Sequence, residues 1–177
     1  MMLQCFVPLC FLYFLSFLSL PGCESRTVIL DKCVINVHTH ELQKHCSALR
    51  PSAIAGDTAI EVRLLDKTLI QKVNEGQTCC FMRLLLRFFV ERVFVNFVSE
   101  PQLQSKASAV ANGLISVRSN IHTCRCQCDE DTQRIMDSIV TEFDKLQINA
   151  AAKKAVGELD TVLDWLELYT QKARAKK

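Results

Sequence analysis

Apolar residues recur with helical spacing along most of the chain. The clearest case is the segment 103–121, where they fall at offsets of 0, 3, 7, 10 and 14 and so share one side of a helix. These positions are Ala107, Val110, Leu114, Val117 and Ile121. An apolar side of this kind predicts a helix that packs on other helices.

Similar patterns predict four further long helices, over 36–49, about 80–97, about 130–146 and about 150–172. The breaks around Pro51 and Gly56 are expected to end the first of them. Alternation at 60–64 indicates an extended segment, and a short helix is predicted around 65–73. No other strand pattern is evident, so the sequence predicts an all-α bundle of six or seven helices.

The predicted helix that ends near Phe97 is apolar on most of its circumference. Its charged residues are Arg83, Arg87, Glu91 and Arg92, and the first three are spaced by four, so they share one narrow stripe. Four charges would each cost roughly 2.5–3.5 kcal/mol at the centre of a bilayer. The segment is therefore predicted to be a central helix of a water-soluble bundle and not a membrane span.

The first residues predict a targeting segment. Cys5–Leu20 is 16 residues long, uncharged and rich in Phe and Leu, whereas a membrane span needs about 20 residues. Pro21-Gly22-Cys23 follows directly. We predict a signal peptide over 1–23, cleaved within 22–25, and a single secreted domain over 24–177. An uncleaved signal anchor is the alternative, because Met1–Gln4 contains no Lys or Arg.

Charge and cysteine content narrow the function. The chain has 177 residues with 21 Lys+Arg and 19 Asp+Glu, which is too balanced for a typical nucleic-acid-binding protein. It also has 10 cysteines, which together with a signal peptide indicate an oxidising compartment and disulfide bonds.

The cysteines of the mature chain fall into an upstream and a downstream group. Neighbouring cysteines do not easily bond to each other, so the bridges should join the two groups, although spacing leaves the pairing open. The groups are Cys33, Cys79 and Cys80, and Cys124, Cys126 and Cys128. Zinc binding by the downstream group with His122 is the alternative. It is disfavoured because paired zinc ligands are usually two to four residues apart and a secreted protein oxidises such thiols.

Two polar clusters are interpreted as solvated surface. His38, His40 and His45 lie near the first predicted helix without a metal-binding carboxylate–histidine motif. The basic tail 172–177 is expected to be a solvated end, with a weak glycosaminoglycan contact as the alternative.

No enzyme motif is present. The chain lacks a nucleophile elbow, a phosphate loop, a dinucleotide fingerprint and a His-Glu-x-x-His zinc motif. Cys79-Cys80 is similar to the start of the phospholipase A2 motif Cys-Cys-x-x-His-Asp, but Arg83 and Leu84 stand where its catalytic pair would be. We therefore expect a binding or signalling protein that is not an enzyme and uses no cofactor or metal.

Several strings carry a family resemblance. The segment 149–167 (NAAAKKAVGELDTVLDWLE) resembles the last helix of the interleukin-10 family of cytokines, in particular its interleukin-19/20/24 group. The double-cysteine segment 79–97 (CCFMRLLLRFFVERVFVNF), the segment 108–114 (SAVANGL) and Cys33-Val34-Ile35 are similar to the same group, in the same order. The buried-looking motif residues Gly157, Leu159, Leu163 and Trp165 are interpreted as core.

The resemblance implies a monomeric, interleukin-20-like helical cytokine that acts in immune and epithelial responses. It would bridge two type II cytokine receptor chains, a heterodimer like the interleukin-20 receptor, and signal through Janus kinases to STAT factors. It also implies the bridges Cys33–Cys124, Cys79–Cys126 and Cys80–Cys128. The candidate receptor-binding positions are His38, Glu41, Lys44, Arg63, Asp66, Lys67, Lys153, Asp160, Asp164 and Glu167.

Some alternatives stay open. Only Arg125 separates Cys124 from Cys126, which is shorter than the family pattern, so a domain-swapped dimer is possible beside the monomer. Cys46 has no family partner: it could bond to Cys23, be buried, or form an intermolecular bond. The alternative function is that of a secreted, disulfide-rich lipid- or pattern-binding protein.

Overall fold

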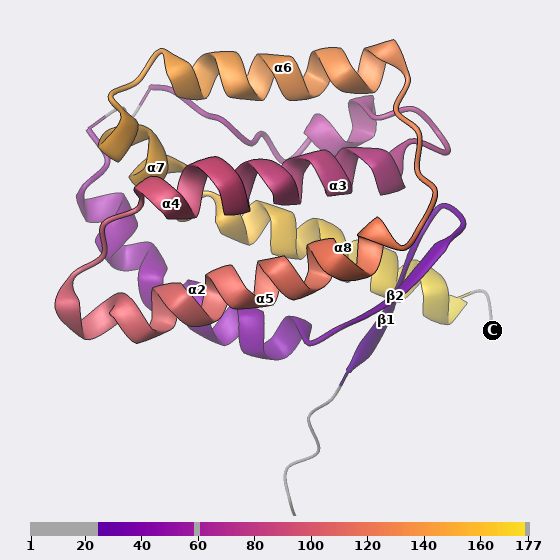
Figure 1. The fold of residues 1–177 in the computed structure, drawn as a ribbon, viewed down its shortest axis with the longest axis horizontal. Coiled ribbons are helices and arrows are strands. Elements are labelled where there is room, and N and C mark those ends of the chain that lie inside the picture. Colours follow the sequence, from indigo (N-terminus) through magenta and orange to yellow (C-terminus); the bar gives the residue numbers. More distant parts are fainter. Residues whose placement is uncertain (1–24, 59–60, 176–177) are drawn as a thin grey trace, which may run out of the picture.

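The computed structural model describes residues 25–58 and 61–175, with side chains as far as Thr170. The predicted signal peptide, Ile60 and the side chains of the basic tail lie outside these residues. The described chain is mostly helical (Figure 1). Its helices are α2 (Thr39–Ala55), α3 (Thr78–Phe88), α4 (Phe94–Asn96), α5 (Gln104–His122), α6 (Glu130–Asp144), α7 (Ile148–Gly157) and α8 (Leu159–Ala175). The shorter elements are η2 (Leu69–Lys72), η3 (Phe89–Val93) and η4 (Pro101–Leu103).

A β-hairpin precedes the bundle, which the sequence pattern did not predict. Strands β1 (Arg26–Leu30) and β2 (Cys33–Val37) pair antiparallel, with Val28 opposite Ile35. Inward-facing positions along both strands are buried and alternate with more exposed ones, which is the period of a half-buried strand. Asp31, at the two-residue turn, has a φ of +57°, a conformation that Asp tolerates better than most residues. The hairpin packs along α8.

Helix α2 begins later than predicted and continues through the expected break at Pro51. Proline removes one backbone hydrogen bond inside a helix. The buried stripe nevertheless continues at helical spacing past it, through Leu42, Cys46, Leu49 and Ala53. Burial of Ala53 in the next turn keeps the chain helical until Gly56, whose N–H bonds to the Ser52 carbonyl.

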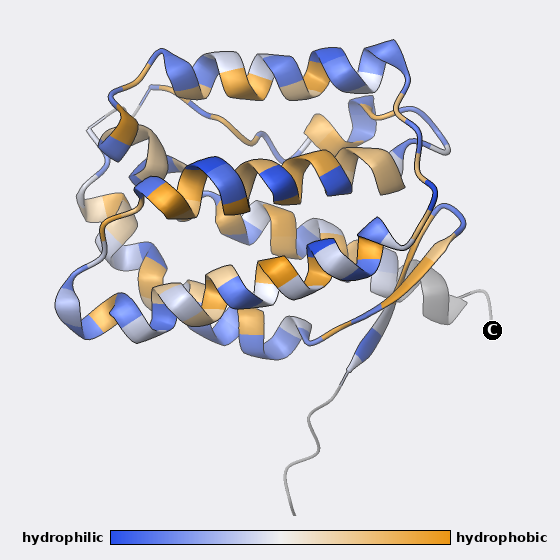
Figure 2. Ribbon diagram, in the orientation of Figure 1, coloured by the Kyte–Doolittle hydropathy of each residue, from blue (hydrophilic) through white to orange (hydrophobic). Residues whose placement is uncertain are grey.

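The predicted central helix is confirmed. It runs without interruption from Thr78 to Asn96 and contains one π-helical turn, η3. Phe81, Leu85 and Phe89 are completely buried on it. Helices α5 and α6 both contact it, and the Phe88 ring meets Phe143 of α6 edge-on at 5.1 Å. Figure 2 shows hydrophobic segments alternating with a recurring hydrophilic stripe on the near side of this helix.

The predicted last helix is two helices. The break is at Glu158, between α7 and α8. The Glu158 carboxylate accepts hydrogen bonds from the backbone N–H groups of Leu64 and Leu65, which belong to the loop before η2, at 2.9 and 2.6 Å. A tertiary contact therefore causes a break that the helical periodicity did not predict. None of the described helices is both long and apolar enough to cross a membrane.

Candidate receptor-binding surfaces

Three disulfide bonds fix one end of the bundle. They are Cys33–Cys124, Cys79–Cys126 and Cys80–Cys128, with Cα–Cα distances of 5.7, 5.8 and 5.4 Å. These are the pairs that the resemblance implies. The sulfur atoms of Cys33, Cys79 and Cys126 lie within 4.8 Å of one another because two bridges are adjacent, and bonded sulfurs are not thiolate ligands for a metal.

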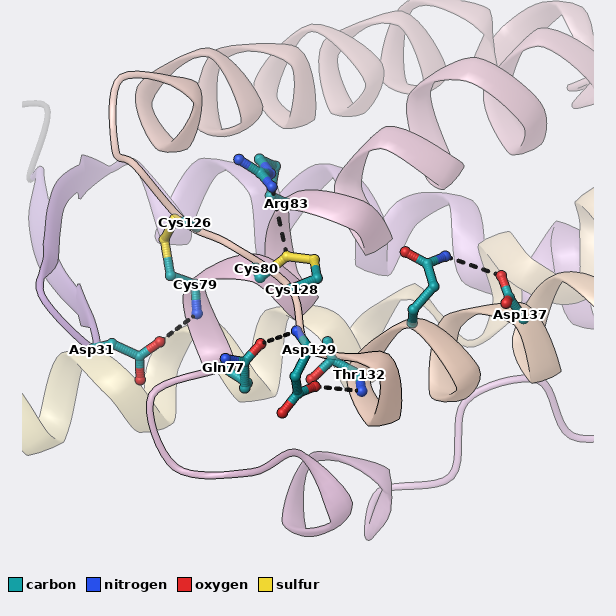
Figure 3. The surroundings of a disulfide bond; sticks show 11 residues. Asp31, Gln77, Cys79, Cys80, Arg83, Cys126, Cys128, Asp129, Thr132 and Asp137 are labelled. Carbon is teal, nitrogen blue, oxygen red and sulfur yellow. Dashed lines mark hydrogen bonds between the residues drawn. A yellow bond between two sulfur atoms is a disulfide. The ribbon is translucent and has the colours of Figure 1, made fainter.

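Polar contacts support these bridges (Figure 3). The Asp31 carboxylate accepts the Cys79 N–H at 2.8 Å, which joins the hairpin turn to the start of α3. The Gln77 side-chain carbonyl accepts the Asp129 N–H at 2.9 Å, and Asp129 in turn caps α6 by accepting the Thr132 N–H at 2.7 Å. The hydrogen bonds from Thr132, with a further one from the Asn74 side chain, hold the pKa of the Asp129 carboxylate below its usual value. The helix start predicted at Asp129 is confirmed.

The candidate binding residues divide into two surfaces on the two flanks of α2. The first, which we call the α8 face, is charged and consists of Arg50, Lys67, Asp160, Asp164 and Glu167. Arg50 pairs with Asp160 at 3.3 Å, and Lys67 pairs with Asp164 at 3.5 Å. Beside them, a hollow of about 290 Å³ lies between α2 and α8.

The loop before η2 is attached to the α8 face. Leu64 and Leu65 are buried, and the Glu158 carboxylate holds their backbone N–H groups. The Trp165 Nε1–H donates to the Lys67 carbonyl at 3.4 Å. Arg63, Asp66 and Lys67 are thereby presented on the outside of the loop, and all three are exposed.

Asp66 stabilises the tip of the same loop. Its carboxylate accepts the backbone N–H and the hydroxyl of Thr68, both at 2.7 Å. These hydrogen bonds lower the pKa of Asp66, so the carboxylate stays ionised at neutral pH. The loop therefore presents a fixed pattern of two cations and one anion.

Three candidates are less exposed than predicted. Glu167 is half-buried because its carboxylate pairs with Arg26 of β1 at 2.7 Å. Asp160 is also half-buried, beside Arg50. Lys153 lies over Gly56 at the end of α2, where a Cβ would stand 2.8 Å from the lysine Nζ.

The neighbouring lysine, Lys154, was not identified from sequence. Its side chain is only 5% exposed, and its ammonium group lies 2.8 Å from Asp57 and 3.8 Å from Glu158. Burial raises the pKa of Glu158, although the hydrogen bonds from Leu65 and Leu64 and the Lys154 charge oppose this. The spacing of polar and apolar residues does not distinguish a buried lysine from an exposed one, so the ion-pair cluster of Lys154, Asp57 and Glu158 is evident only from the structure.

The second surface, which we call the α2–α5 groove, lies on the other flank of α2. His38, directly before α2, and Glu41 of α2 line one wall, and Asn112 and Ser116 line the other from α5. Its volume is about 300 Å³. A Cβ at Gly113 would collide with the Leu42 side chain, so this glycine permits the close approach of the two helices. Lys44 is exposed and lies between the two surfaces on the outer side of α2.

Cys46 lies beneath the α8 face. It is 2% exposed and forms no disulfide with any residue that the structure describes, and Cys23 is outside that part of the chain. Burial raises the pKa of the Cys46 thiol to about 12, so the group stays protonated. Of the alternatives considered, the structure matches a buried thiol.

Comparison with known proteins identifies the family. Residues 28–169 match the family model described as "Interleukin 22 IL-10-related T-cell-derived-inducible factor". The chain belongs to the interleukin-10 family. Mouse interleukin-20 is 33% identical over 148 residues, which cover 80% of this chain and 84% of the relative. Human interleukin-19 is 28% identical over 143 residues, covering 77% and 81%.

Solved structures agree with this assignment. The crystal structure of human interleukin-19 superimposes with a TM-score of 0.69 at 29% identity, covering 74% of this chain and 88% of that one. The structure of an edited form of human interleukin-24 superimposes with a TM-score of 0.65 at 26% identity, covering 80% of this chain and 94% of that one. The relatives are interleukin cytokines, so this member of the interleukin-10 family is a cytokine and not an enzyme.

Proposed function

We propose that this cytokine is secreted and bridges two type II cytokine receptor chains, a heterodimer like the interleukin-20 receptor, and thereby activates Janus kinase–STAT signalling. The observation that carries the proposal is the presence of two separate surfaces on the flanks of one helix, α2. A bridging ligand needs two such surfaces that do not overlap. The family membership supports the kind of partner.

The α8 face suits the first receptor chain. The Lys67–Asp164 pair is exposed and the Arg50–Asp160 pair is partly exposed. Such pairs contribute about 0–1 kcal/mol to folding, so their charges can be exchanged for receptor charges at little cost. The loop beside them is held by Glu158 and Trp165, so little conformational entropy is lost when a receptor binds it.

The α2–α5 groove suits the second receptor chain. It combines His38, Glu41, Asn112 and Ser116 with apolar lining residues. Such a groove can receive one protruding side chain from a partner, which is how a few residues carry most of the energy of an interface.

Three disulfides formed within one chain support a monomer as the acting form. Light scattering of the oxidised protein should therefore give the mass of a single chain.

Surface plasmon resonance with type II receptor ectodomains tests the proposal. Oxidised mature protein is passed over each ectodomain alone and over mixed pairs, and STAT phosphorylation is measured in cells carrying the same pairs. We expect tight binding to one mixed pair and STAT phosphorylation only where both chains are present. Absence of binding to every pair by folded, fully bridged protein would contradict the proposal.

A second set of measurements separates the function from the fold. Protein reduced and alkylated before injection should lose binding, because the bridges hold α3, α6 and the hairpin together. If binding to lipid vesicles replaced receptor binding, the lipid-binding alternative would be supported instead.

A further inference from the structure

A basic groove lies on the side of the bundle opposite the α8 face. It runs between α3 and α5, which are nearest the viewer in Figure 1, whereas α8 and α2 lie behind them. Its volume is about 620 Å³. We call it the arginine groove, and its charged and titratable lining residues are Arg83, Arg87, Glu91, Arg118 and His122.

The charges in this groove are not balanced. Glu91 is the only carboxylate among its described lining residues, and it pairs with two guanidinium groups, Arg87 at 2.9 Å and Arg118 at 2.8 Å. Arg83 has no carboxylate partner within the described chain. Its guanidinium group donates to the Cys80 sulfur at 3.6 Å, which is a weak acceptor. Three guanidinium groups therefore face one carboxylate.

We infer that the arginine groove binds a sulfated polysaccharide of the glycosaminoglycan type. Planar guanidinium groups donate paired hydrogen bonds to sulfate and carboxylate groups. Arg83 and Arg87 are four residues apart on α3, about 6 Å along its axis, and Arg118 lines the groove from α5. A linear polyanion with repeated charges fits such an arrangement better than one isolated anion does.

The composition of the groove favours a polysaccharide over an acidic protein. Its large apolar lining residues are Leu84 and Ile115, and it has no aromatic side chain among the described lining. Protein interfaces are enriched at their centres in Tyr, Trp and Phe, and this groove offers none. Because it faces away from the α8 face, a bound polysaccharide would leave that face open to a receptor.

Binding of the full mature protein to immobilised heparin, at about 0.15 M ionic strength, tests the inference. The triple variant Arg83→Ser, Arg87→Ser, Arg118→Ser should bind heparin at least about tenfold more weakly, since charge-assisted hydrogen bonds are lost. Arg134→Ser removes one exposed arginine from α6 and serves as the matched control, with unchanged affinity expected. Circular dichroism checks that each variant is folded.

Competition, receptor-binding and tail-substitution experiments decide the inference. Desulfated heparin should not compete with heparin, and the triple variant should retain receptor binding and STAT activation if the wild type has them. Unchanged heparin binding by the triple variant would overturn the inference, as would loss of binding on substitution of the basic tail alone (Lys172→Ser, Arg174→Ser). Loss of receptor binding with heparin binding intact would show that the groove recognises an acidic protein.

Discussion

The two sides of α8 have different roles. Leu159, Leu163 and Trp165 face the core and are at most 4% exposed. On the other side, Asp164 is exposed and Asp160 and Glu167 are half-buried beside ion-pair partners. The buried side carries the string by which the family can be recognised, whereas the outer side carries the candidates for receptor contact. The residues of the family motif and the candidate receptor contacts therefore lie on opposite faces of α8.

Packing explains this separation. A buried side chain fits among close-packed neighbours, so a change of one methylene has an energetic cost. Exposed ion pairs contribute little to stability and can change without unfolding the protein. The interpretation of Leu159, Leu163 and Trp165 as core residues is confirmed by their burial, whereas Gly157, the fourth residue so interpreted, is only half-buried.

The largest change in the free energy of unfolding is expected for substitutions on the buried side of α8. Trp165→Ala should lower the free energy of unfolding by about 3–5 kcal/mol, because the indole is buried against Phe81, with ring centroids 5.8 Å apart. Trp165→Phe keeps most of that packing and loses the hydrogen bond to Lys67, so it should cost less. Urea denaturation measures both variants. A cost below about 1 kcal/mol for Trp165→Ala would contradict the assignment of the motif to the core.

Removal of the Cys33–Cys124 disulfide, which anchors the hairpin that packs on α8, should have the next largest effect on stability. The Cys33–Cys124 bridge closes a sequence separation of 91 residues. Its replacement by two serines should destabilise the protein by about 2–5 kcal/mol. Cys46→Ala removes a buried cysteine that forms no disulfide within the described chain and should cost about 1 kcal/mol, measured for both variants by urea denaturation. Equal costs would mean that the bridge does not hold the hairpin in place.

Glu158 lies directly before α8, and its contribution to the free energy of unfolding should depend on pH. Glu158→Gln keeps an acceptor for the Leu64 and Leu65 N–H groups and removes the charge, at a cost of about 1 kcal/mol at neutral pH. Burial raises the pKa of Glu158 in the folded protein. As pH rises from the ordinary glutamate pKa to this raised value, the unfolded chain loses its proton first, and the wild type loses stability relative to the variant.

Urea denaturation at several pH values measures this difference. The advantage of the wild type over Glu158→Gln should shrink as pH rises through that window. Glu142→Gln, which removes an exposed carboxylate paired with Lys145 on α6, is the control and should show no such trend. An advantage that grows with pH would show that the contacts with Lys154 and the backbone outweigh burial.

The smallest effect on stability is expected on the outer side. Asp164→Ala should change the free energy of unfolding by less than about 0.5 kcal/mol, since its partner Lys67 is exposed and 3.5 Å away. It should nevertheless weaken receptor binding about tenfold if Asp164 is one of the few dominant contacts. Asp137→Ala on α6 is the matched control. An equal loss of affinity in both variants would remove Asp164 from the receptor surface.

The sequence predicted those elements whose pattern is local. The apolar spacing of 103–121 and the acidic start at Asp129 correspond to α5 and α6 within about one residue. The hairpin was missed because its strands are five residues each, and no Gly or Asn marks the turn at Asp31 and Lys32. The continuation of α2 past Pro51 and the break at Glu158 depend on tertiary burial and on a contact between distant residues, which periodicity does not encode.

For the candidate receptor-binding residues, too, the sequence predicted local properties and not tertiary contacts. Helical phase identified exposed residues such as Glu41, Lys44 and Asp164 correctly. It did not predict that they divide between two flanks of α2, because this depends on which neighbours cover each flank. It also did not identify Lys154 as buried or Glu167 as paired with Arg26 of the unpredicted hairpin.

The most direct test of the account is simultaneous binding of both receptor ectodomains to one cytokine. Light scattering on the purified mixture should give the mass of one cytokine with one copy of each receptor chain. Asp164→Ala with Lys67→Ala should lose one chain, and His38→Ala with Glu41→Ala should lose the other. Loss of the same chain in both variants, or a complex with only one kind of receptor chain in the wild type, would contradict the two-surface account.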